Sequence, residues 1–149
     1  MQPYPLREGA MYENAIANWY YQNMLFLQQV FYDKVVIYDR EEYTWVRIDN
    51  FDLPPIWIPR YSNLLITLPG VYTGIHVSPS EFYLDKNLRT ITGWTTVHYF
   101  QAQGANRLSH LNYAYLCLHL QDWKPSWDVL SGDNLLTIVD LIYQRMSKA

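Results

Sequence analysis

The 149 residues of this chain are 50% apolar and 17% aromatic and carry a formal net charge of −3, which suits one globular domain and excludes a disordered chain. No Lys/Arg cluster and no apolar run of membrane-spanning length is present, so neither nucleic acid nor a membrane is an expected partner. The single cysteine cannot form an internal disulfide, which favours a reducing, cytoplasmic location.

The N-terminal part of the chain predicts one amphipathic helix. Residues 1–10 hold two prolines and a glycine and are expected to be a loose lead-in. Over residues 13–32, apolar side chains recur at three- and four-residue steps. The opposite face carries uncharged amides, among them Asn18, Gln22 and Asn23, and is interpreted as a solvated face or as a docking face. The apolar stripe consists of Ile16, Trp19, Tyr20, Met24, Leu27, Val30 and Phe31.

A four-stranded antiparallel meander is predicted to follow this helix. The β-prone runs are separated by the turn at 39–42, by the prolines of 53–59, which indicate an edge or a loop, and by Pro69-Gly70. The four strands are expected at residues 34–38, 43–48, 62–68 and 80–84.

Residues 85–115 show no clear periodicity, apart from a brief candidate strand at 97–100. A last helix is predicted after Pro125, with Asp133 as its N-cap and with Arg145 and Lys148 near its end, where cations suit the helix dipole. One helix, a meander, a cysteine-bearing segment and a second helix form an α+β pattern in a single domain over 1–149. The buried stripe of the last helix is expected to be Leu135, Ile138, Val139, Ile142 and Met146.

The only cysteine lies in a segment that alternates in polarity. In an extended chain, Leu116, Leu118 and Leu120 point towards the core, while Tyr115, Cys117, His119 and Gln121 share the other side. A thiol acts as a nucleophile when it ionises, which a nearby cation or a polar setting favours. The strand rise of about 3.3 Å per residue predicts that the side chains of Cys117 and His119 are roughly 7 Å apart, which is too far for a direct hydrogen bond between them. The alternative is a buried cysteine that acts as a small apolar side chain.

The motifs of the C-terminal half, taken in order, resemble those of ubiquitin-conjugating enzymes. That family has a His-Pro-Asn motif, a Leu-Cys-Leu nucleophile segment, a Trp-x-Pro element and a Leu/Ile-rich helix. The resemblance spans nearly the whole chain in the order of elements and residues 110–142 in motif. The matching residues are His110-Leu111-Asn112, Leu116-Cys117-Leu118, Trp123-Lys124-Pro125 and residues 135–142.

The chain more specifically resembles the divergent bacterial branch of this family. That branch is found in operons for ubiquitin-like conjugation, some of which act in antiphage defence. Residues 68–70, 81–85 and 123–125 carry this resemblance. The chain also departs from the family pattern, because Leu111 stands where the family has proline and Asn112 lies only five residues before the cysteine.

The resemblance implies acyl transfer in two steps. Cys117 takes the C-terminal carbonyl of a ubiquitin-like protein from an activating enzyme as a thioester, and a lysine amine of a target protein then attacks it. Asn112 is implied as the donor to the oxyanion. His119, inferred from its spacing, or Asp128 accepts the proton of the amine. No cofactor or metal is implied.

Three alternatives stay open at this point. A protein of the same fold can hold a ubiquitin-like partner without catalysis. A cysteine hydrolase would pair Cys117 with His98 or His110, brought close by the fold. A zinc site formed by His110, Cys117 and His119 has a spacing that matches no common structural pattern.

Overall fold

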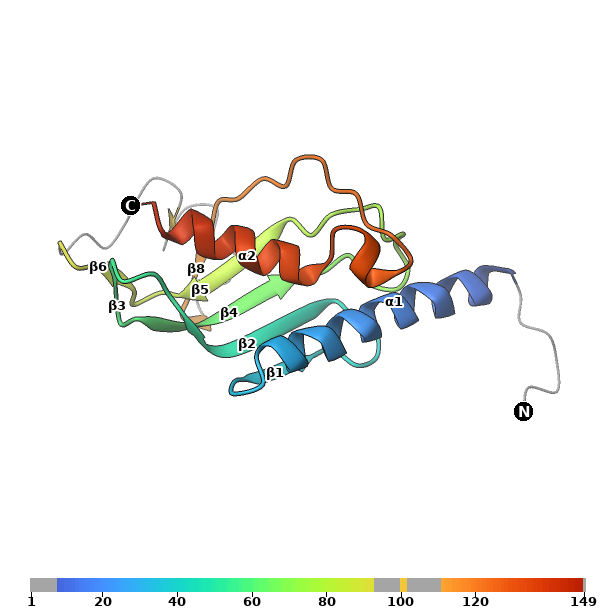
Figure 1. Cartoon of the computed structure of the whole chain (residues 1–149), viewed down its shortest axis with the longest axis horizontal. Coiled ribbons are helices and arrows are strands. Elements are labelled where there is room, and N and C mark those ends of the chain that lie inside the picture. The colour runs from blue at the N-terminus through green and yellow to red at the C-terminus, as the bar shows by residue number, and fades with distance from the viewer. Residues whose placement is uncertain (1–7, 93–99, 102–110, 149) are drawn as a thin grey trace.

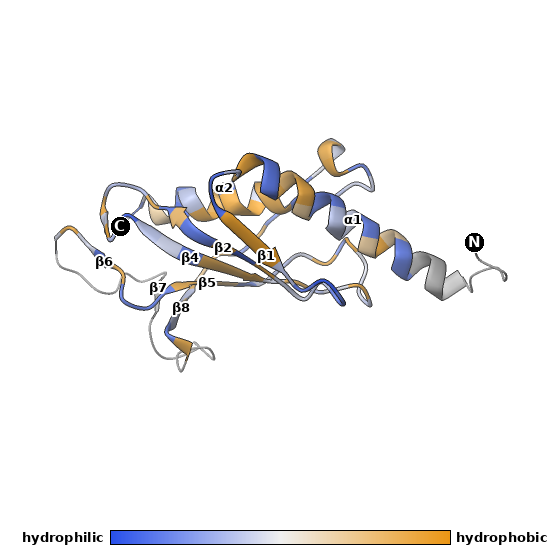
Figure 2. Ribbon diagram, turned by 90° about the horizontal axis from the view of Figure 1, so that it is seen from below, coloured by the Kyte–Doolittle hydropathy of each residue, from blue (hydrophilic) through white to orange (hydrophobic). Residues whose placement is uncertain are grey.

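The computed structural model describes residues 8–92, 100–101 and 111–148. Two helices, α1 (Glu8–Val30) and α2 (Leu135–Met146), lie on one face of an antiparallel sheet, and the core fills the space between them, as Figures 1 and 2 show. In the described part, the sheet has six strands in the order β1-β2-β4-β5-β8-β7. Their bounds are β1 (Val35–Tyr38), β2 (Trp45–Asp52), β4 (Tyr61–Thr67), β5 (Glu81–Asp85), β7 (Phe100–Gln101) and β8 (Tyr113–Leu116).

The predicted meander is confirmed as β1, β2, β4 and β5, each paired antiparallel with the next. Alternation sets its two faces, since Val46 and Ile48 of β2 are buried beneath the helices while Arg47 points to the outer face. Asp39 organises the first turn by accepting hydrogen bonds from the backbone N–H groups of residues 41, 42 and 44. Gly70 follows β4 with φ of 87°, a conformation that favours glycine.

Helix α1 begins at Glu8, so the expectation that residues 8–10 belong to a loose lead-in is wrong. A single glycine near a helix start costs only about 1 kcal/mol and did not prevent helix formation. Five members of the predicted apolar stripe, from Ile16 to Leu27, are buried. Val30, the last residue of α1, is instead 41% exposed.

Asn23, which the helical pattern predicts on the polar face of α1, is buried. Its side-chain oxygen accepts a hydrogen bond of 2.8 Å from the backbone N–H of Leu135, and its amide donates to the carbonyl of Trp19. The first N–H groups of a helix have no partner within that helix. Asn23 supplies one to α2, and this tertiary contact explains why an amide lies on the buried face.

Residues 85–115 contain strands that the sequence did not reveal. Strand β8 pairs with β5, so that Phe82 faces Leu116 and Asp85 faces Tyr113. Two-residue strands β3 (Trp57–Ile58) and β6 (Arg89–Thr90) form a separate small sheet. Such short strands carry no detectable periodicity. The candidate strand at 97–100 meets β7 only at Phe100, and its first three residues lie outside the described chain.

The buried stripe predicted for α2 is confirmed at all five positions, but its N-cap is Asn134 and not Asp133. The Asn134 side chain accepts from the N–H of Thr137, whose hydroxyl accepts from the Asn134 N–H. Asp133 is engaged elsewhere, because its carboxylate accepts from the N–H of Lys124 at 2.8 Å. Neither described helix combines the length and apolar character needed to cross a bilayer.

Candidate functional site

Cys117 lies one residue beyond the end of β8, close to the start of β5. Leu116 is fully buried, as predicted, but beyond it the predicted alternation is not seen, because Cys117, Leu118 and Leu120 are all half-buried and all pack against the core. The thiol of Cys117 is half-buried, and the side chain of His119 is exposed. The arrangement therefore presents the thiol at the surface while the leucines anchor its segment.

The sulfur of Cys117 and the Nε2 of His119 are 3.7 Å apart, within hydrogen-bond distance for sulfur. The expected 7 Å separation is wrong because strand rise separates backbone atoms, whereas the imidazole ring extends back towards the thiol. A neutral imidazole can accept the thiol proton, and an imidazolium can donate to the thiolate. Either arrangement supports a reactive cysteine.

Tyr115 is a site residue that sequence reasoning placed on the thiol's face without giving it a role. Burial raises the pKa of its phenol, and the negative charges of the Cys117 thiolate and of Glu81 raise it further. The ring of Tyr115 also meets that of Tyr83 edge to face, with centroids 5.8 Å apart. The alternating pattern that places Cys117 and His119 on one side also includes Tyr115, so the sequence alone could have identified Tyr115 as a site residue.

Asn112 is not brought to the thiol. It precedes the first residue of β8, and Cys117 follows the last, so the two are separated by about 16 Å of extended chain. The Asn112 carbonyl accepts from the N–H of Lys86, and its φ of 67° places it in the left-handed region typical of a turn. This placement does not favour the implied role of Asn112 as an oxyanion donor at Cys117, and that role stays a prediction.

Asp128 is fully exposed and serves a local structural role. It caps the short 3-10 helix η2 (Val129–Ser131), accepting from the Ser131 hydroxyl at 2.6 Å and from the N–H of Leu130. These hydrogen bonds, that of Ser131 first, hold the pKa of the Asp128 carboxyl below its usual value. No contact among the described residues joins Asp128 to Cys117.

A shallow groove of about 400 Å³ lies between α1 and η2. Two of its residues are strongly exposed, Trp127 at 51% and Leu130 at 71%. Gln22, from the amide-rich face of α1, forms part of the opposite wall. The amide face thus continues into exposed apolar side chains, a combination common at protein interfaces. The lining residues are Gln22, Leu25, Phe26, Gln29, Trp127, Asp128, Val129 and Leu130.

The segment after Cys117 is fastened at two points. The indole N–H of Trp123 donates to the carbonyl of Ile75 at 2.9 Å, and the N–H of Lys124 donates to Asp133. Pro125 forms an isolated bridge with Asp133. The Trp-x-Pro element therefore ties the cysteine segment to the 70–80 loop and to the start of α2.

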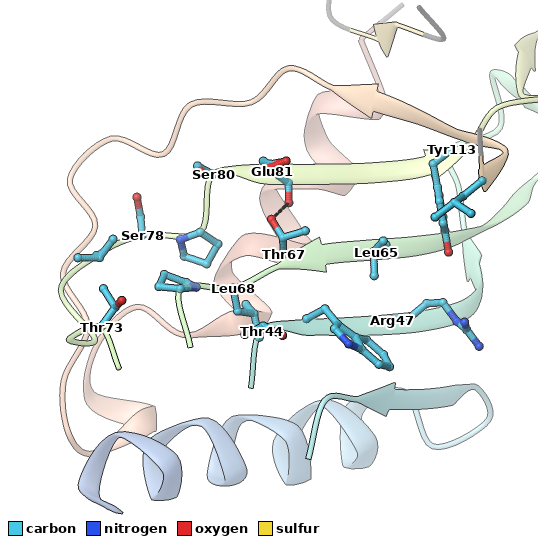
Figure 3. Close-up of a pocket in the computed structure, with 15 residues that line it drawn as sticks. Thr44, Arg47, Leu65, Thr67, Leu68, Thr73, Ser78, Ser80, Glu81 and Tyr113 are labelled. Carbon is cyan, nitrogen blue, oxygen red and sulfur yellow. Dashed lines mark hydrogen bonds between the residues drawn. The ribbon is translucent and has the colours of Figure 1, made fainter. Parts of the chain in front are cut away.

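A larger cavity of about 770 Å³ lies on the outer face of the sheet (Figure 3). Neither Cys117 nor His119 lines it, so this cavity is not the thiol site. Glu81, which borders it, lies one residue before Phe82, the cross-strand partner of Leu116. The lining residues are Thr44, Trp45, Arg47, Leu65, Thr67, Leu68, Pro69, Thr73, Val77, Ser78, Pro79, Ser80, Glu81, Leu111 and Tyr113.

His98 and His110, the candidate partners in a hydrolase or a zinc site, lie outside the described residues. Among the residues that the structure describes, no group of three or more His, Cys, Asp or Glu side chains is placed to hold a metal ion. Comparison with models of protein families, with curated proteins and with solved structures found no significant match.

Proposed function

We propose that this chain is a conjugating enzyme that carries a ubiquitin-like protein as a thioester on Cys117 and passes it to an amine. The observation that carries the proposal is the 3.7 Å contact between the half-buried thiol and the imidazole of His119. The motif order around the cysteine and the α+β arrangement support it.

In the first step, the Cys117 thiolate attacks the C-terminal carbonyl of the donor, held as a thioester on an activating enzyme. A new carbon–sulfur bond to Cys117 forms, the carbon–sulfur bond to the activating enzyme breaks, and the cysteine of the activating enzyme leaves as a thiolate. In the second step, a lysine amine attacks the carbonyl on Cys117 and the Cys117 thiolate leaves. His119 takes the amine proton, directly or through one water molecule.

The tetrahedral intermediate of each step carries an oxyanion that needs a donor. Asn112 lies at the other end of β8, and we assign this role to the phenol of Tyr115. The alternating pattern of the sequence places it on the face of the thiol, and a tyrosine phenol is protonated at neutral pH, where its O–H can donate.

The placement in the bacterial branch, with a cytoplasmic and antiphage setting, belongs to the same proposal, supported by the residues of 68–70, 81–85 and 123–125. The genes adjacent to this one are the first place to look for its ubiquitin-like protein and activating enzyme.

The test is the charging of Cys117→Ala in the presence of activating enzyme, ubiquitin-like protein and ATP. The wild-type chain should give a band on a non-reducing gel that a reducing agent removes, and Cys117→Ala should give none while keeping its circular dichroism spectrum. Cys117→Ser is the matched control, because it can form only an ester that resists the reducing agent.

A reducible band from Cys117→Ala would overturn the assignment. Loss of the fold in Cys117→Ala would support a buried structural cysteine instead. If the wild-type chain binds the ubiquitin-like protein but forms no reducible band, the chain is a binding module of the same fold.

A further inference from the structure

One end of the molecule is rich in cations. It is formed by three segments, 53–61, 86–92 and 141–148, which hold five cationic side chains. Carboxylates border this end, but Asp52 is paired with Lys34 and Asp85 accepts a hydrogen bond from the backbone N–H of Asn63. The other six cations and all 14 carboxylates belong to the remaining chain, which is therefore strongly acidic. We call this end the basic tip; its cations are Arg60, Lys86, Arg89, Arg145 and Lys148.

The three segments meet in space. Strand β3, in the first, pairs with β6, in the second. The indole N–H of Trp57 in β3 donates to the carbonyl of Met146, the last residue of α2, at 2.6 Å. Figure 1 shows β3, β6 and the C-terminal end together at one end of the molecule, and Figure 2 shows β6 and the C-terminal end together there.

The small sheet of the basic tip has one buried side and one exposed side, and the exposed side carries both apolar and cationic side chains. Its inner pair, Trp57 and Thr90, is buried. Its outer pair is Ile58 and Arg89, and Ile91 follows on the same side two residues after Arg89. Ile58 is 39% exposed and Ile91 is 62% exposed. Exposed isoleucines therefore stand directly beside exposed cations.

We propose that the basic tip binds the surface of an anionic lipid bilayer. Branched apolar side chains enter the boundary between headgroups and acyl chains, while neighbouring arginines reach lipid phosphates. Each Lys or Arg near such a surface raises partitioning about five-fold. The acidic remainder is repelled by the same surface, so the molecule docks with the tip towards the bilayer.

Two other anionic partners fit the tip less well. Single-stranded nucleic acid is bound largely by aromatic side chains that stack on bases, and the indole of Trp57 is buried. An acidic protein segment would satisfy the cations but leave the two isoleucines without a partner. The sequence-based expectation of no membrane partner depends on the length of apolar runs. That length decides whether a segment can cross a bilayer, and it does not decide whether a protein can bind to the bilayer surface.

Contact of the basic tip with a bilayer would leave the thiol of Cys117 accessible. The backbone N–H of Lys86 in the tip donates to the carbonyl of Asn112, just before β8, whereas Cys117 follows the opposite end of that strand. The inference does not depend on the proposed chemistry, and Cys117→Ala should bind vesicles as the wild type does.

The test is co-sedimentation of the full chain with two kinds of vesicle, phosphatidylcholine alone and phosphatidylcholine with about 30% phosphatidylserine. Binding is expected only to the second kind and should weaken as salt is raised. Arg60→Glu with Arg89→Glu should lower the partition coefficient at least about 25-fold, since two favourable charges are lost. The matched control is Arg40→Glu with Lys124→Glu, which changes two cations outside the tip and should leave binding within about two-fold.

Ile58→Ser with Ile91→Ser separates a bilayer from other anionic partners. Both side chains are exposed, so the fold should survive, and vesicle binding should fall about ten-fold or more. Unchanged vesicle binding in this variant would overturn the bilayer assignment, because it would show that the tip binds anions through its charges alone. Absence of binding to the anionic vesicles at low salt, or an equal loss in the control, would overturn the proposal as a whole.

Discussion

The imidazole of His119 contacts the thiol of Cys117 from two residues away, and the proposed chemistry depends on this pair. Both residues belong to one short segment whose leucines hold it against the core. A change at His119 can therefore alter proton transfer without removing the anchors of the segment.

His119→Ala should slow single-turnover discharge of the thioester to free lysine by about 100-fold near pH 6, and by less as the pH rises towards about 9. At low pH the amine needs a base, and at higher pH it loses its proton without one. Gln121→Ala, at an exposed position of the same segment, is the matched control and should discharge at the wild-type rate. A deficit that stays constant across the range would leave packing as the only role of His119.

Tyr115→Phe should slow both charging and discharge by about 100-fold, because it removes one donor to the oxyanion and keeps the ring. Asn112→Gly should discharge at nearly the wild-type rate, since Asn112 lies at the other end of β8 and glycine tolerates its φ of 67°. The measurement is the same single-turnover assay. The reverse result, with slow Asn112→Gly and normal Tyr115→Phe, would restore the donor role implied by the family resemblance.

At the scale of elements, α1 has two sides of different character. Its buried side packs on the sheet and supplies Asn23 to the start of α2. Its exposed side carries Asn18 and Gln22, and Gln22 lines the groove that also contains Trp127 and Leu130. The uncharged amides lose little on desolvation, which favours a docking role for this side.

Asn18→Glu with Gln22→Glu should slow charging by the activating enzyme about ten-fold and leave discharge of a preformed thioester unchanged. Added charge opposes docking, whereas discharge to free lysine needs no docked partner. Gln144→Glu, on the exposed side of α2, is the matched control and should charge normally. Equal slowing of both steps by the α1 variant would count against docking.

At the scale of the whole molecule, three buried or half-buried indole groups join segments that are distant in sequence. Trp19 donates to Ser126, Trp57 to Met146 and Trp123 to Ile75. Each bond spans 48 residues or more, so none of them stabilises a single element. They stabilise the relative positions of the helices, the loops and the cysteine segment.

Trp123→Phe should slow charging several-fold while costing about 1 kcal/mol in the free energy of unfolding, measured by urea denaturation. The lost hydrogen bond loosens the segment that positions Cys117. Trp57→Phe is the matched control, because it removes a bond of the same kind at the basic tip. If both variants charge equally slowly, stability and not local positioning controls the rate.

The sequence by itself determined the two helices and the four strands of the meander, because each depends on a local period of apolar side chains. It could not determine features that depend on contacts between distant residues. Only the tertiary structure showed that Asn23 is buried against Leu135. It also placed Asn112 and Cys117 at opposite ends of β8, since strand pairing and not sequence separation fixes that distance. The basic tip is likewise tertiary, because its cations come from three segments that meet only in the fold.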